Sequence, residues 1–141
     1  MKDLHSNIDV VSVLDPVVWS ATATYTDIDL AGFNSAELLI WVGLDAGTGL
    51  SAEHKVVFTL QDSDDGTTYA NVETADVLGA GTITSGVILT VDSTDEDNTL
   101  YNYGYVGGKR YLQLVATETG TVSCPIAVGV IKGHPLDAPT S

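Results

Sequence analysis

The chain has few cations and no long apolar run, and each shortage excludes a class of protein. Its 141 residues hold 5 lysines and arginines against 19 aspartates and glutamates, a formal net charge of −14. Because five cations cannot neutralise many phosphates, we expect neither direct nucleic-acid binding nor docking to an anionic membrane. The longest uncharged apolar stretch, residues 38–44, is far shorter than the roughly 20 residues that a membrane-spanning helix needs.

Cysteine is almost absent too. Cys124 is the only one, so the chain forms no internal disulfide and needs no oxidising compartment to fold. It lies in the apolar run 122–131, which predicts a buried and inert thiol. The apolar run 10–14 is too short for the core of a signal peptide and is flanked by aspartates. We therefore expect the protein to be made and folded in a cytoplasm.

What the chain does have is a succession of short alternating segments separated by turn residues. From Val17 to Tyr25 every second side chain is apolar or small and the opposite face is rich in threonine, which is typical of a half-buried strand. The run 38–42 is continuously apolar and predicts a central strand covered on both faces. Asp65-Gly66 lies between two alternating runs and predicts a hairpin turn.

About eight or nine such strands with no substantial helix predict an all-β fold, a jelly-roll-like β-sandwich of antiparallel strands. The length suits one domain with a core of its own. We expect an extended N-terminal arm over residues 1–16, because Asp15-Pro16 interrupts the pattern there. The sandwich is expected over residues 17–132, and the proline-containing segment 133–141 is expected to be an extended C-terminal tail.

No pattern of catalytic or metal-binding residues stands out, so we expect a protein that is not an enzyme and binds neither cofactor nor metal. Asp62, Asp64 and Asp65 precede a glycine, but the spacing and the closing glutamate of a calcium loop are missing. The three histidines are far apart and lack the spacing of zinc ligands. A surface calcium ion at the acidic segment 92–98 is an alternative to a plain solvated loop.

Two features are candidates for partner binding. Tyr101, Tyr103 and Tyr105 fall on one face of a strand, where they could pack across strands, anchor a protein interface or stack on a sugar. Lys109 and Arg110 are adjacent cations in a very acidic chain. They could meet a carboxylate of a partner, or form an ion pair with one of the chain's own acids.

Four motifs, taken together and in order, resemble small structural proteins of tailed bacteriophages and prophages. Residues 29–33 (Asp-Leu-Ala-Gly-Phe) precede an apolar strand, and residues 61–66 (Gln-Asp-Ser-Asp-Asp-Gly) precede a hairpin. Residues 105–114 (Tyr-Val-Gly-Gly-Lys-Arg-Tyr-Leu-Gln-Leu) and 133–139 (Gly-His-Pro-Leu-Asp-Ala-Pro) follow. The resemblance runs from about Trp19 to Pro139.

The resemblance implies a virion protein that binds other virion proteins, assembled in the host cytoplasm, and a head decoration or cement role fits it best. The major capsid protein is the expected partner, met by the termini, including His134 and Pro135, and by the cation pair. We expect a homo-oligomer, and a trimer would suit the threefold positions of an icosahedral shell. The alternatives are a tail or head–tail component, or a carbohydrate-binding jelly-roll module that takes glycans.

Overall fold

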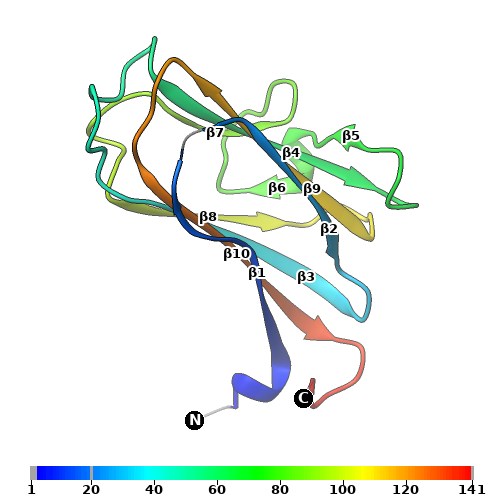
Figure 1. The fold of residues 1–141 in the computed structure, drawn as a ribbon. Helices are drawn as coiled ribbons and strands as arrows, with labels where there is room; N and C mark the ends of the chain where they lie inside the picture. The colour runs from blue at the N-terminus through cyan, green and yellow to red at the C-terminus, as the bar shows by residue number, and fades with distance from the viewer. Residues whose placement is uncertain (1–2, 20, 141) are drawn as a thin grey trace.

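The computed structural model describes residues 3–19 and 21–140, which form a sandwich of two antiparallel β-sheets (Figure 1). Sheet A contains, in spatial order, β1 (Ile8–Val18), β10 (Pro125–Pro135), β3 (Phe33–Val42), β8 (Thr99–Tyr105) and β6 (Val77–Leu78). Sheet B contains β2 (Ala23–Asp29), β9 (Tyr111–Thr119), β4 (Lys55–Ser63) and then β5 (Ala70–Asn71), with β7 (Val87–Val91) also paired to β4. Two 3-10 turns, η1 (His5–Asn7) and η2 (Thr74–Asp76), are the helices of the described residues, and neither has the length to cross a membrane.

The strand order is that of a jelly roll. The strands pair as a nested series, from the ends of the chain inward: β1 pairs with β10, β2 with β9, β3 with β8 and β4 with β7. Pairing of β10 with β3 and of β9 with β4 then rolls this nested hairpin into two sheets. This arrangement confirms the predicted fold class. The two-residue strands β5 and β6 are an addition between β4 and β7, which brings the strands of the described residues to ten.

The core lies between the sheets because the central strands β3, β4, β9 and β10 bury every second side chain over most of their length. In β3 the even-numbered residues from Ala36 to Val42 are buried, and Leu38 and Ile40 are fully so. Strand β4 does the same with Phe58 and Leu60. Trp19 follows β1 and is 3% exposed, and its backbone N–H donates to the carbonyl of Cys124. Cys124 is itself buried, as the sequence predicts, and burial raises the pKa of its thiol to about 12.

The sandwich begins earlier in the chain than the sequence indicates. Residues 8–16 belong to β1 and pair with β10 as the edge of sheet A, so the expected arm is wrong for them. Pro16 is tolerated because it lies within the register shift between Leu14 and Val17 on an edge strand, where a missing N–H breaks no ladder. Residues 1–2 of the expected arm lie outside the described residues.

The expected extended tail is also shorter than predicted. Strand β10 continues to Pro135, and the chain then folds back toward the N-terminal end (Figure 1). The Leu136 N–H donates to the carbonyl of Gly32, and the Thr140 N–H and hydroxyl donate to the carbonyls of Ser6 and Ile8. Residues 136–140 are therefore docked on the body of the protein, and residue 141 lies outside the described residues.

Candidate partner-binding site

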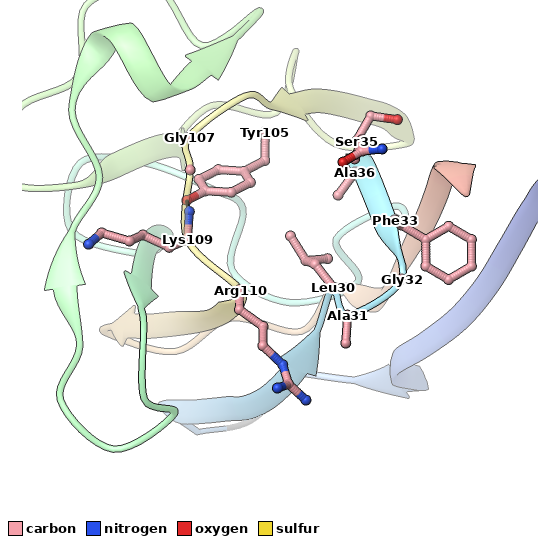
Figure 2. A pocket seen from close by; sticks show the side chains of 12 residues that line it. Leu30, Ala31, Gly32, Phe33, Ser35, Ala36, Tyr105, Gly107, Lys109 and Arg110 are labelled. Atoms are coloured by element: carbon pink, nitrogen blue, oxygen red, sulfur yellow. Dashed lines mark hydrogen bonds between the residues drawn. The ribbon is translucent and has the colours of Figure 1, made fainter. Parts of the chain in front are cut away.

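Lys109 and Arg110 line a hollow at one end of the sandwich, between the loop that follows β8 and the turn that joins β2 to β3 (Figure 2). Leu30 and Phe33 contribute from the turn, and Tyr105 contributes from the end of β8. Gly107 and Gly108 of the loop also line the hollow. The hollow thus gathers two of the four cations among the described residues in a very acidic chain.

Both cations are already paired with acids of the chain itself. Figure 2 shows the side chains diverging, with Lys109 toward the hairpin that follows β4 and Arg110 toward β2. The Lys109 ammonium forms an ion pair with Asp64. Arg110 grips Asp29 with two hydrogen bonds, from Nε at 2.9 Å and from Nη2 at 2.8 Å. Lys109 and Arg110 therefore form ion pairs within the chain, which was one of the two alternatives. Their contact with a partner stays a prediction.

The Asp29–Arg110 pair makes stability depend on pH. The guanidinium holds the pKa of Asp29 at about 2, below the roughly 3.9 of an unfolded aspartate. Because the folded pKa is lower, the pair stabilises the protein above about pH 4, and this contribution is lost as pH falls toward 2. Arg110→Gln is expected to lower the melting temperature modestly at pH 6 and to lose most of this effect as pH falls to 2.5. A constant effect over that range, measured by thermal melts, would contradict the pairing. Lys55→Gln is the control, because Lys55 forms no ion pair within residues 3–19 and 21–140.

The tyrosines form no surface strip. Tyr103 and Tyr105 point into the sandwich and are 6% and 3% exposed, and burial raises the pKa of both, for Tyr103 to about 12. Tyr101 packs against the same core, and its hydroxyl donates to the carbonyl of Glu96 at 2.7 Å. Period 2 places the three on one face, but that face is the inner one. Of the three interpretations, the structure therefore agrees with packing of the tyrosines across strands. The buried rings of Tyr103 and Tyr105 cannot stack on a sugar or a partner.

Tyr105 instead holds the wall of the hollow together through hydrogen bonds of its hydroxyl. Its hydroxyl donates to the buried carboxylate of Asp62 at 2.8 Å and accepts the backbone N–H of Lys109 at 3.2 Å. This links β8, β4 and the loop that carries the cation pair. A side chain on Gly107 would overlap the Tyr105 ring, so the glycine is needed for the ring to lie here.

Removal of the Tyr105 hydroxyl leaves a buried carboxylate without its donor. Tyr105→Phe is therefore expected to lower the free energy of unfolding by about 1.5–3 kcal/mol, the usual range for a hydrogen bond to a charged group. Urea unfolding at pH 7 measures it. Tyr101→Phe is the matched control, because that hydroxyl donates to a neutral carbonyl, and its expected loss is about 1 kcal/mol. Equal losses in the two variants would contradict the assigned role of Asp62.

His134 and Pro135 lie apart from the cation pair, at the end of β10. His134 adopts a positive φ of 52°, and its Nδ1 is 2.8 Å from the hydroxyl of Ser35. Pro135 lies opposite Phe33 in the ladder between β10 and β3. The structure therefore does not bring all the predicted residues into one site: Lys109, Arg110 and Tyr105 share a hollow, whereas Tyr101, Tyr103, His134 and Pro135 do not line it.

The three aspartates of the β4–β5 connection also diverge. Asp62 binds the Tyr105 hydroxyl, Asp64 binds Lys109, and Asp65 accepts the backbone N–H groups of Thr67 and Thr68. Those hydrogen bonds lower the pKa of Asp65 to about 2. The segment is a hairpin turn, with β5 returning along β4 as the Asp-Gly signal predicts.

A feature that the sequence analysis missed is the outer face of sheet A. Leu39 and Trp41 of β3, Leu100 of β8 and Val10 of β1 line an apolar hollow there, and Trp41 is 59% exposed. The predicted covering of β3 on both faces is wrong for the isolated chain, because sheet B covers only the inner side. The signal was present in the continuous apolar run 38–42.

Comparison with solved structures shows a fold shared with one prophage-derived protein. The crystal structure of the SPBc2 prophage-derived protein YomS superposes with a TM-score of 0.53 at 10% identity, over 91% of this chain and 94% of that one. A Bacillus endospore appendage from a family of disulfide-linked pili gives 0.44 at 12% identity, over 96% of both chains. The capsid of cyanophage Pam1 gives 0.39 at 16% identity, over 96% and 90%. No protein-family model matches the chain, and no curated protein matches it.

Proposed function

We propose that the chain is a structural protein of a tailed-phage virion and that it decorates the outside of the head. The observation that carries the proposal is the jelly roll shared end to end with a prophage-derived protein, at 91% and 94% coverage. The four motifs that resemble phage structural proteins support it independently. A jelly roll is also an architecture of viral capsid domains, although fold alone does not fix function.

The proposal is of a binding protein without catalysis. Several carboxylates that could serve as acid or base are held by structural hydrogen bonds. Asp29 is gripped by Arg110, Asp62 receives the Tyr105 hydroxyl, and Asp65 receives backbone amides. A stiff two-sheet body suits repeated docking on a symmetric shell, where many modest contacts add up through avidity when copies also contact each other.

The decisive experiment is to purify the particles made by the phage or induced prophage that encodes this chain. Gradient-purified heads, separated tails and the soluble fraction are probed by quantitative mass spectrometry. We expect the chain to co-sediment with heads at a fixed copy number per capsid protein. A chain found only in the soluble fraction would overturn the proposal.

A tail location is the competing assignment within the same class. Cryo-electron microscopy of wild-type particles and of particles lacking the chain distinguishes the two. A decoration protein accounts for density that disappears from the outer surface of the head, whereas a tail component accounts for missing density on the tail. The same maps report the symmetry of its sites and hence whether it binds as a trimer.

A further inference from the structure

We propose that the outer face of sheet A is the surface that docks on the partner virion protein, and that this partner presents an apolar ridge flanked by lysine or arginine. The inference rests on the proposed function and names the face that performs it. The face consists of the outward residues of β1, β10, β3, β8 and β6. In the central strands β3 and β10 these residues alternate with buried ones.

This face is apolar where the matching face of sheet B is polar. Its exposed side chains include Val10 at 64%, Trp41 at 59% and Leu100 at 47%. Outward positions of sheet B carry instead mostly threonine and amide side chains, including Thr59, Gln61, Gln113 and Thr117. A continuous apolar run such as 38–42 is typical of a strand buried on both sides. Sheet B buries one side, so a second protein surface is the missing cover for the other.

The shape of the face adds a separate argument. Ala127 and Gly129 occupy the outward positions in the middle of β10, so a trough runs along this strand between β1 and β3. The fold itself does not require Gly129, since its φ is not positive and a Cβ would meet only the Val11 carbonyl at an ordinary 3.5 Å. Glycine inside a strand costs about 0.5–1 kcal/mol relative to alanine. Such a glycine often marks the close approach of another chain.

The charges around the face specify the partner. Along β3 and β8, Glu37 carries the one carboxylate, and it already accepts a hydrogen bond from Asn102 at 2.7 Å. Beyond the trough, the loops 43–50 and 92–98 lie at the same end of the sandwich, at the left of Figure 1, and the Asp45 N–H donates to Asp97. These loops and β1 contain acids and no lysine or arginine. Asp9 forms an ion pair with Lys132 and is set aside. The remaining acids are Asp15, Asp45, Asp92, Asp95, Glu96 and Asp97.

This arrangement favours a basic partner over a second copy of the chain. A pairing of two identical faces would bring two acidic rims together between molecules of charge −14 each. Like charges that face each other across an interface cost several kcal/mol, whereas opposite charges steer association and fix its register. An apolar centre with a charged rim is also the usual anatomy of a specific interface.

The test measures binding of the purified chain to particles that lack it, by co-sedimentation over a range of concentrations. Trp41→Glu is expected to weaken binding at least about 30-fold, as loss of a central tryptophan anchor does. Gly129→Val fills the trough without adding charge and is expected to weaken binding about tenfold while the melting temperature holds. Thr117→Glu places the same charge on exposed sheet B surface and is expected to stay within twofold of wild type.

Salt tests the partner's charge. Wild-type affinity is expected to fall about tenfold between 50 and 300 mM NaCl, because the acidic rim is screened. Affinity that is constant or rises with salt would overturn the basic partner. Trp19→Phe leaves Trp41 as the single tryptophan, and its emission should shift to the blue on binding if the face is covered.

The outcomes separate the two proposals. If wild type binds particles but Trp41→Glu and Gly129→Val bind equally well, the docking face is wrong and the virion role stands. If folded wild type binds neither heads nor tails, the virion role fails, and the docking face fails with it. If sedimentation equilibrium shows a stable wild-type oligomer that Trp41→Glu dissolves, the occupant is a second copy and the assigned partner is overturned.

Discussion

Phe58→Ala is expected to lower the free energy of unfolding by about 3–5 kcal/mol, the usual cost of removing a large buried aromatic side chain. Phe58 is 0% exposed and lies in β4, the strand that β9 flanks on one side and β5 and β7 on the other. Its ring belongs to the single core between the sheets, so neighbours fixed in ladders on both sides cannot collapse into the cavity.

Guanidinium unfolding followed by tyrosine and tryptophan fluorescence measures the loss. Trp41→Ala is the control, because it removes an even larger aromatic side chain from a mostly exposed position. Its expected change is within about 1 kcal/mol in the free protein. A loss below about 1.5 kcal/mol for Phe58→Ala would mean that the two sheets pack more loosely than the structure indicates.

Gly120→Ala is expected to cost roughly 2–4 kcal/mol, through backbone strain and steric overlap together. Gly120 joins β9 to β10 at a φ of 68°, in the left-handed region that disfavours side chains. A Cβ there would overlap the carbonyl oxygen of Glu53 and lie 2.6 Å from Nδ1 of His54. The same His54 nitrogen accepts the N–H of Thr121, so the turn cannot move away without losing that hydrogen bond.

Gly32→Ala separates the two causes. Gly32 has a φ of 85°, but a Cβ there would meet nothing within 4 Å, so only the strain of about 1–2 kcal/mol applies. Urea midpoints of the two variants give the difference. If Gly120→Ala proves no more costly than Gly32→Ala, the close packing of the β9–β10 turn on residues 53–54 is contradicted.

Local alternation was enough to predict the fold class but not the pairing of strands. Period 2 and the turn signals identify most strands, because a strand that buries one face must alternate. Which strands become neighbours depends on contacts between distant residues, such as Ile8 opposite Gly133. For the same reason the sequence predicts an arm over residues 8–16. Their short apolar stretch can be recognised as an edge strand only when its pairing with β10 is known.

The candidate site was predicted only in part, and the reason is the same. Alternation places the three tyrosines on one face without saying which face is buried. The opposite side of that strand carries Leu100, Asn102 and Gly104, so neither side was clearly polar. The adjacent cations can be recognised in the sequence, but the acids that pair with them, Asp29 and Asp64, are 81 and 45 residues away.

The pairing of the first strand with the last governs how the molecule acquires its structure. Strand β1 emerges from the ribosome early, yet its hydrogen-bonding partner β10 is synthesised last of the described strands. Sheet A cannot close before β10 is synthesised, and until then the edge of β3 that β10 will occupy is open to wrong neighbours. Folding of this protein is therefore expected to be slow, as in other β-rich topologies dominated by distant pairings.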